Sequence, residues 1–248
     1  MYFAKGDSMF QALLPHRTLP FGSFGFWWQQ DGQWVEEPNA RRGGASGVKR
    51  LALAGFPLLY AKRQVGHTYR SLRYPLGRPT VLREQEALQA FATLGIGVPQ
   101  VVFCAAERSA DSRWRALLVT EALDGFQDLD QWYASGGAAR YGQDAHLELL
   151  QALGGLLARL HLARWQHGCL YAKHVFVRLA APHAAGQPRV QLALLDLEKS
   201  RRRLSARRAA RHDLRQLRRH SSLDATDWQQ LIYGYQTAFG SAIKGLQS

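Results

Sequence analysis

The feature that most constrains the fold of this chain is a change of residue pattern near Asp124. Before it, short strand-like segments are separated by Gly, Pro and Asn clusters, whereas longer segments with apolar residues at helical spacing follow it. A sheet followed by helices is typical of an α+β protein with two lobes. We expect an N-terminal extension over residues 1–22, a β-rich N-lobe with one main helix over 23–123, and a mainly helical C-lobe over 124–248.

In the expected N-lobe, the strand-like segments are FGFWW, QWVEE, VKRLAL, PLLYAKRQV, VPQVVFCAAE and RWRALLVTEAL. The main helix is predicted in RPTVLREQEALQAFATLG, because its apolar residues fall largely on one face and Gly95 can end it. These elements predict an antiparallel sheet with one helix packed on it.

In the expected C-lobe, HLELLQALGGLLARLHLARW predicts a buried central helix. Its apolar stripe contains Leu147, Leu150, Leu153, Leu157, Leu160 and Leu162. HVFVRL and VQLALLDLE predict a short β pair joined by the loop APHAAGQP, and DATDWQQLIYGYQTAF predicts a final helix with Asp224 as its N-cap.

Positive charge is concentrated in one run of the sequence. The formal net charge is +13, and the segment from Lys199 to His220 contains ten Lys or Arg against the single acid Asp213. Such a field attracts anionic partners, so we expect an anionic acceptor or an anionic membrane surface to bind there. The alternative is a solvated amphipathic face. No zinc-finger, RRM or helix-turn-helix pattern accompanies the charge, and we expect no nucleic-acid partner.

Cysteine usage and apolar runs bear on localisation. Cys104 and Cys169 lack metal-motif spacing and are too few for a disulfide scaffold, which favours a reducing compartment. The N-terminal residues have no secretory-signal pattern, and the longest apolar run, Leu51 to Ala61, is too short for a membrane helix. We expect a cytoplasmic protein, with peripheral contact at the inner face of the inner membrane as a further option.

A glycine cluster lies between two strand-like segments in RRGGASGV. There Gly43, Gly44 and Gly47 surround Ser46, and a hairpin of this composition can cover a phosphate with backbone N–H groups. A plain glycine-rich turn is the alternative, because no helix with a Lys-Ser/Thr pair follows as a P-loop requires.

A lysine interrupts the next apolar strand. Lys62 in LLYAKRQV needs a partner if it is buried, and Glu84, early in the following helix, is the candidate. In nucleotide-binding folds such an ion pair holds the lysine against the α- and β-phosphates. The alternative is an edge-strand lysine that prevents strand pairing with another chain.

The segment WQHGCLYAKHVFV, Trp165 to Val177, raises the question of a catalytic loop. From His167 to His174 it has the length of the protein-kinase pattern H-R-D-L-x-x-x-N, with His174 in the Asn position. Farther on, Asp196 follows an apolar strand, where the kinase pattern has D-F-G. A carboxylate at that position needs a cation or several donors. The alternative for the loop is a buried hairpin edge.

In this order, the motifs resemble the lipopolysaccharide kinases of the InaA/WaaP type, a bacterial branch of the protein-kinase-like fold. The resemblance runs from about Asn39 to His220 and is carried by RRGGASGV, YAKRQ, LREQEALQAFATLGIGVP, LVTEAL, QHGCLYAKHVFV, LLDLEK and RHDLRQL. It implies a two-lobed protein-kinase-like fold, ATP and Mg²⁺ as cofactors, and phosphorylation of heptose in the lipopolysaccharide core on the cytoplasmic side.

The resemblance also implies roles for individual residues. Lys62 and Glu84 would anchor the phosphates, and the backbone of Glu121 to Leu123 would meet adenine. Asp196 and His174 would hold the metal. Asp213 matches the acid that braces the catalytic loop by accepting its backbone N–H bonds.

Cys169 departs from the family pattern, because it stands where the catalytic Asp is expected. With Asp196, it is a catalytic candidate, and its neighbours His167 and Lys173 could activate the thiol. Phosphoryl transfer depends mainly on positioning and charge neutralisation, so loss of the base can slow it without abolishing it. Three functions follow: an active sugar kinase, a pseudokinase that binds nucleotide or an anionic partner without turnover, and, least supported, a basic nucleic-acid-binding protein.

Overall fold

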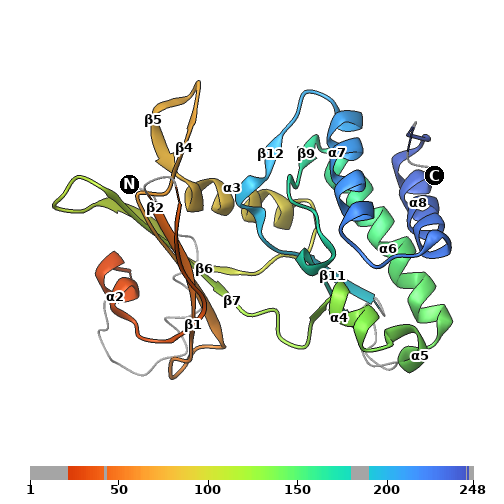
Figure 1. Ribbon diagram of the computed structural model, residues 1–248, viewed down its shortest axis with the longest axis horizontal. Coiled ribbons are helices and arrows are strands. Elements are labelled where there is room, and N and C mark those ends of the chain that lie inside the picture. Colours follow the sequence, from red (N-terminus) through yellow and green to blue (C-terminus); the bar gives the residue numbers. More distant parts are fainter. Residues whose placement is uncertain (1–21, 42–43, 180–189, 244, 246–248) are drawn as a thin grey trace. The chain divides into compact units, whose positions relative to one another are not determined.

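The computed structural model describes residues 22–41, 44–179, 190–243 and 245. The chain forms two compact units. Unit 1 comprises Met1–Glu86 and Gln100–Ala122, and unit 2 comprises Ala87–Pro99 and Leu123–Ser248. Unit 1 is β-rich and unit 2 is mainly helical (Figure 1), as the α+β prediction requires.

Unit 1 is built on a five-stranded antiparallel sheet in the order β1-β2-β3-β7-β6. Its strands are β1 (Gln33–Arg41), β2 (Gly44–Leu51), β3 (Leu59–Val65), β6 (Val101–Arg108) and β7 (Trp114–Glu121). The strands expected in VKRLAL, PLLYAKRQV, VPQVVFCAAE and RWRALLVTEAL are therefore confirmed. A separate hairpin of β4 (Thr68–Ser71) and β5 (Tyr74–Pro79) was not predicted.

The segment FGFWW forms helix α2 (Phe24–Gln29), so the strand predicted there is wrong (Figure 1). Aromatic residues favour strands in general, but two local contacts favour the helix. Ser23 caps it by accepting a hydrogen bond from the Phe26 N–H at 3.1 Å. Trp27, only 2% exposed, packs in a core with Leu59 and Ala61 of β3.

The predicted main helix is confirmed as α3 (Thr80–Thr93), which Gly95 follows with φ +68°. Its first turn contacts the sheet face opposite the Trp27 core. Gln64 of β3 accepts hydrogen bonds from the Thr80 hydroxyl at 2.8 Å and the Val81 N–H at 3.3 Å. Because side chains alternate along a strand, Lys62 lies on the same face as Gln64.

Unit 2 contains α4 (Leu129–Ala134), α5 (Gly137–Tyr141), α6 (Gln143–Leu162), α7 (Ala206–Arg219) and α8 (Ala225–Phe239). Its strands are β8 (Gln127–Asp128), β9 (Trp165–Gln166), β10 (Val175–Leu179), β11 (Val190–Leu194) and β12 (Arg201–Arg202), with 3₁₀ turns η1 (Ala172–His174) and η2 (Leu197–Lys199). The predicted pair is the antiparallel β10–β11 ladder, and its APHAAGQP loop lies outside the described residues. Asp224 caps α8 as predicted.

The predicted central helix is α6, which packs along α8 (Figure 1). Glycines allow the close approach, because a Cβ at Gly154 would lie 2.2 Å from the Leu231 carbonyl oxygen, and one at Gly234 would lie 2.4 Å from the Gln151 carbonyl oxygen. The predicted stripe is too broad, since Leu147 is 39% and Leu162 51% exposed. Among the described residues, no helix is both long and apolar enough to cross a membrane.

Candidate functional site

In unit 1, the expected ion pair is present between β3 and α3. Lys62 Nζ lies 2.8 Å from Glu84 Oε2, and both side chains are largely buried. The neighbours of Lys62 across the sheet are Val48 of β2 and Leu118 of β7, so the lysine is on a central strand. This position contradicts the alternative of an edge-strand lysine.

The glycine cluster lies where β1 and β2 meet. Gly43 is outside the described residues, and Gly44 and Gly47 belong to β2 rather than to a loop. A Cβ at Gly47 would lie 2.9 Å from the Glu36 carbonyl oxygen, beside the register shifts of β1. Ser46 Oγ accepts a hydrogen bond from Gln64 at 3.3 Å. Gly47 thus has a packing role that is independent of any phosphate.

The segment Glu121 to Leu123 continues from the end of β7. The Glu121 N–H donates to the Gln100 carbonyl at 2.9 Å, and the Ala122 N–H donates to the Leu58 carbonyl at 2.8 Å. In the part of the chain that the structure describes, the Leu123 N–H has no such backbone acceptor. Of the three N–H groups, that of Leu123 is the one left for a ligand.

In unit 2, Asp213 of α7 holds the loop after β9, as expected. Its two carboxylate oxygens accept the N–H of His167 at 2.6 Å and the N–H of Gly168 at 3.0 Å. The same oxygens contact His161 Nε2 at 3.2 Å and His212 Nδ1 at 3.1 Å. Asp213 is fully buried, so this one side chain satisfies several buried polar groups at once.

Charge states in this network follow from burial and hydrogen bonding. Burial alone would raise the pKa of the Asp213 carboxyl, but hydrogen bonds with His161 and His212 outweigh burial and hold it below its usual value. Burial is the main reason why the pKa of His167 falls to about 4, against the opposing attraction of Asp213. His167 is therefore neutral near pH 7.

The ring of His167 contacts backbone groups of the loop and of the segment after β11. Its Nε2 lies 3.0 Å from the Leu195 carbonyl oxygen, and its Nδ1 accepts the Cys169 N–H at 3.3 Å. Gly168 between them has φ +84°, and a Cβ there would lie 2.6 Å from the Lys199 carbonyl oxygen. These contacts favour a positioning role for His167 and explain the glycine.

Cys169, His174 and Asp196 come together at the end of this loop. Each offers one ligand atom, and the three atoms lie within 4.8 Å of one another. His174 Nε2 and Asp196 Oδ2 are 3.6 Å apart. Asp196 has φ +60°, a left-handed conformation that is uncommon outside glycine and that clusters at functional sites.

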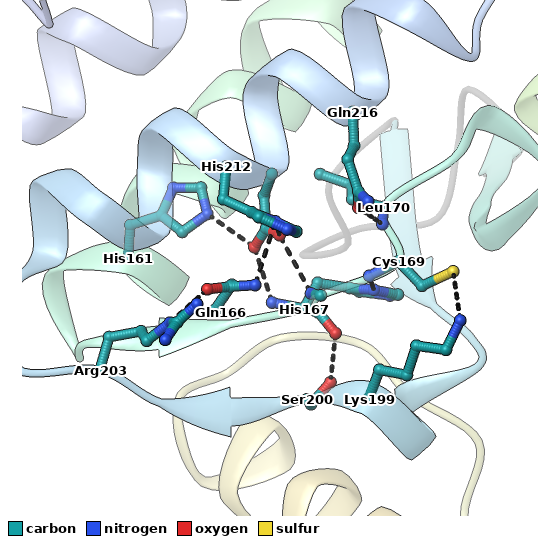
Figure 2. A network of polar contacts seen from close by, with 12 residues as sticks. His161, Gln166, His167, Cys169, Leu170, Lys199, Ser200, Arg203, His212 and Gln216 are labelled. Carbon is teal, nitrogen blue, oxygen red and sulfur yellow. Dashed lines mark hydrogen bonds and ion pairs between the residues drawn. The ribbon is translucent and has the colours of Figure 1, made fainter.

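Other charged residues near the loop were not predicted. Lys199 Nζ lies 3.8 Å from Cys169 Sγ (Figure 2), whereas the predicted neighbour Lys173 is exposed. Asp130 of α4 accepts a hydrogen bond from the Lys173 backbone, and burial followed by repulsion from Asp128 raises the pKa of the Asp130 carboxyl. Lys199 stands at the end of the LLDLEK motif, but sequence spacing gave no indication that it reaches Cys169.

Most of the basic run forms α7, one face of which lines a hollow of about 430 Å³. We call it the α7 groove, and its lining residues are Arg203, Arg208, Arg211, His212, Arg215, Gln216 and Arg219. None of these lining residues is acidic.

The α7 groove shares residues with the contacts that hold the loop (Figure 2). Arg203 donates to the Gln166 side chain, whose Nε2 lies 3.0 Å from His212 Nδ1. Gln216 accepts the Leu170 N–H at 3.1 Å. The groove and the loop are therefore parts of one polar network.

Comparison with known proteins gives consistent results. Residues 26–235 match the model of a protein family that is described as "Lipopolysaccharide kinase (Kdo/WaaP) family". Protein InaA of Escherichia coli (strain K12) is 39% identical over 215 residues, which cover 86% of this chain and 95% of InaA. The structure of WaaP in complex with acyl carrier protein has a TM-score of 0.64 at 18% identity, covering 88% of this chain and 83% of that one. This likeness confirms the predicted protein-kinase-like fold.

Proposed function

The chain belongs to the lipopolysaccharide kinase (Kdo/WaaP) family, and we propose that it is an ATP-dependent phosphotransferase that acts on a heptose of the lipopolysaccharide core. In this reaction an acceptor hydroxyl oxygen bonds to the γ-phosphorus of ATP, the bond to the β–γ bridging oxygen breaks, and ADP leaves. The hydroxyl proton passes to a nearby base or to water. The observation that carries the proposal is the buried Lys62–Glu84 pair.

Unit 1 would bind the nucleotide. Lys62, positioned by Glu84 at 2.8 Å, would contact the phosphates. We propose Gly44, Ser46 and Gly47, with Gly43, as backbone neighbours of the phosphates. The segment Glu121 to Leu123 would meet adenine, and the Leu123 N–H is its available donor.

Unit 2 would supply the metal ligands and the braced loop. The family implies ATP with a divalent metal, and Mg²⁺ is the expected ion. Mg²⁺ takes oxygen ligands in near-octahedral geometry. The Asp196 carboxylate suits it, but the His174 imidazole and the Cys169 thiol do not. The residues present thus fit Mg²⁺ only in part.

Cys169 decides between an active kinase and a pseudokinase. It is 5% exposed and has no carboxylate to orient an acceptor hydroxyl. Asp213 nevertheless keeps the loop in place through two backbone N–H bonds. Positioning contributes most of the catalysis in phosphoryl transfer, so we propose that turnover persists at a reduced rate.

Turnover of Cys169 variants tests this proposal. In an assay of γ-phosphate transfer from ATP to purified core oligosaccharide, we expect Cys169→Asp to raise turnover, because it restores a carboxylate that can accept the hydroxyl proton. We expect Cys169→Ala to lower turnover about tenfold or less, because Cys169 has no carboxylate to accept the hydroxyl proton and alanine therefore removes little catalytic capacity. Cys104→Ala is the matched control, because burial raises the pKa of that thiol to about 12 and it lies in unit 1.

Two results would contradict the account. No turnover in either the wild type or Cys169→Asp, with ATP still bound, would identify a pseudokinase. A loss above roughly a hundredfold in Cys169→Ala, with the fold intact, would make the thiol itself catalytic, activated by Lys199, whose Nζ lies 3.8 Å from the sulfur.

We further propose that the α7 groove binds the anionic acceptor. The described residues provide no carboxylate partner for Arg208, Arg211, Arg215 or Arg219. Guanidinium groups bind phosphate through paired hydrogen bonds, so phosphate groups on a lipopolysaccharide core would complement this lining. An anionic membrane surface is the other target, and it would place the protein at the inner face of the inner membrane.

Charge reversal in the α7 groove tests acceptor recognition. Arg208→Glu with Arg215→Glu is expected to weaken binding of core oligosaccharide more than about tenfold, since hydrogen bonds to charged groups contribute about 1.5–3 kcal/mol each. The matched control is Arg201→Glu with Arg202→Glu, an equal charge change on exposed β12 outside the lining. Binding is measured by calorimetry in low and physiological salt, and it should weaken as salt rises.

Equal losses of oligosaccharide binding in the two double variants would indicate attraction by the overall positive charge rather than binding in the α7 groove. Loss of binding to anionic vesicles, with oligosaccharide binding retained, would assign the groove to a membrane surface. If Arg208→Glu with Arg215→Glu binds both core oligosaccharide and anionic vesicles as tightly as the wild type, the basic run is only a solvated face.

A further inference from the structure

The cluster of Cys169, His174 and Asp196 has the composition of a transition-metal site. Its three ligand atoms are one sulfur, one imidazole nitrogen and one carboxylate oxygen, all within 4.8 Å of one another. Zn²⁺ binds these three donor types, usually with four ligands in tetrahedral geometry. Bonds of 2.0–2.3 Å place neighbouring ligand atoms roughly 3.3–3.8 Å apart, and the 3.6 Å between His174 Nε2 and Asp196 Oδ2 already matches.

The donor types discriminate between metals. Thiolate and imidazole ligands select zinc and related transition metals, whereas Mg²⁺ prefers carboxylates, carbonyls and water. Replacing the expected Asp with Cys169 removes a hard oxygen donor from this position and supplies a soft one. The same substitution that weakens the case for a catalytic base therefore strengthens the case for zinc.

Hydrogen bonds hold the ligands in a suitable orientation. His174 Nδ1 lies 2.7 Å from the Cys169 carbonyl oxygen, and because a carbonyl can only accept, Nδ1 carries the proton. In the neutral ring, Nε2 then presents its lone pair toward Asp196. A metal-binding histidine is typically fixed in this way by a backbone carbonyl.

The surroundings of the sulfur and the carboxylate also fit. Lys199 Nζ, 3.8 Å from Cys169 Sγ, can donate toward a metal-bound thiolate. Cys169 and His174 are buried, but the Asp196 side chain is 39% exposed. One side of the cluster is thus accessible for a fourth ligand, such as water, as in open zinc sites.

We propose that Cys169, His174 and Asp196 form a zinc-type site in unit 2, with three protein ligands and one open position, that takes Zn²⁺ in preference to Mg²⁺. Binding at this site needs no nucleotide and no turnover, so the inference is independent of the proposed kinase activity. A zinc ion there would occupy both residues proposed for magnesium and would compete with it.

Cobalt(II) provides the test, because a Co²⁺–thiolate bond gives a charge-transfer absorption band that reports sulfur ligation directly. Untagged, metal-free protein is titrated with Co²⁺ and then with Zn²⁺. We expect one equivalent of Co²⁺ to produce the band, Zn²⁺ to remove it, and a large excess of Mg²⁺ to leave it unchanged. Cys104→Ser is the matched control and should keep the band.

Cys169→Ser should lose the band. Asp196→Asn retains the Cys169 thiol and should retain the fold, but we expect it to weaken Zn²⁺ binding by more than roughly 100-fold. Losing a residue that only hydrogen-bonds to a metal ligand commonly lowers metal affinity about 10- to 100-fold, and losing the ligand itself should lower it further. Circular dichroism checks that each variant is folded. If Cys169→Ser does not fold, Asp196→Asn alone tests the proposal. Absence of a thiolate band in the wild type, its loss in Cys104→Ser, or displacement by Mg²⁺ would overturn the proposal.

Discussion

Replacing Asp213 with alanine is expected to lower the free energy of unfolding by about 3–5 kcal/mol, the range seen when one partner of a buried charged network is removed. The carboxylate is fully buried and accepts hydrogen bonds from the backbone N–H groups of His167 and Gly168. Alanine would leave both donors, and the His161 and His212 rings, without this acceptor. Urea denaturation followed by circular dichroism measures the change.

Two further variants make the measurement specific. Asp213→Asn keeps one oxygen acceptor but sets an amide N–H₂ against a backbone donor, so a smaller loss of about 1–3 kcal/mol is expected. Asp224→Ala removes the exposed N-cap of α8 and should cost about 1 kcal/mol. If Asp213→Ala costs no more than Asp224→Ala, Asp213 does not hold the loop.

The effect of Asp213 should also depend on pH. Its pKa is lower in the folded protein than in the unfolded chain, so its stabilisation is fully present above the unfolded value, near 4, and is lost as pH falls below it. The difference between wild type and Asp213→Asn should therefore narrow in acid. His167, with a folded pKa of about 4, destabilises both proteins below about pH 6.5. Asp213→Asn removes the attraction that opposes this lowering of the His167 pKa, so the contribution of His167 cancels only above about pH 4.

The order of motifs indicated the family resemblance, and that resemblance implied both the kinase-like fold and the role of Asp213 in holding the loop. Asp213, the single acid in a basic run, was assigned to backbone N–H groups of the loop, and the structure confirms it. This contact could be predicted because Asp213 is the single acid in the basic run and because the loop that it binds has a recognisable pattern of its own. The nucleotide and metal roles of Lys62, Glu84, Asp196 and His174 remain predictions.

Elements without a buried face could not be predicted in this way. The β4–β5 hairpin carries Leu72 and Leu76, which are 105% and 90% exposed, so apolar periodicity contains no signal for it. The α7 groove shows a related limit. Arg208, Arg211, Arg215 and Arg219 have the spacing of one helix face, but the hollow also needs Arg203 from outside the helix.

Long-range neighbours of Cys169 were the hardest to foresee. The family resemblance implied Asp196 and His174 as metal ligands but placed Cys169 at the catalytic base position, and the two cysteines have no metal-motif spacing with each other. The fold instead brings His174 and Asp196 to the thiol, with Lys199 30 positions along the chain from it. A ligand set assembled from a loop, a 3₁₀ turn and a strand end has no fixed spacing, so it becomes visible only in three dimensions.

Lys62→Ala is expected to reduce ATP affinity roughly 10- to 100-fold, because a charge-assisted contact with phosphate contributes about 1.5–3 kcal/mol. The lysine lies on the sheet face that α3 covers and is already oriented by Glu84 at 2.8 Å, so little side-chain entropy is lost when phosphate binds. Calorimetric titration with ATP measures the loss. Both this substitution and Lys62→Met remove the ammonium group that pairs with Glu84, but Lys62→Met keeps the apolar stem, so it is measured in parallel to separate loss of the charge from loss of packing.

Lys49→Ala is the matched control for this prediction. Lys49 stands opposite Ala61 on the neighbouring strand β2, so its side chain points to the other sheet face, where it pairs with the exposed Asp31 at 3.1 Å. It carries the same charge in the same sheet but contacts neither Glu84 nor α3, so its removal should leave ATP affinity unchanged. A general field effect of unit 1 would lower affinity equally in both variants. Unchanged affinity in folded Lys62→Ala and Lys62→Met would show that the buried pair only stabilises unit 1, and the proposed phosphate contact would be wrong.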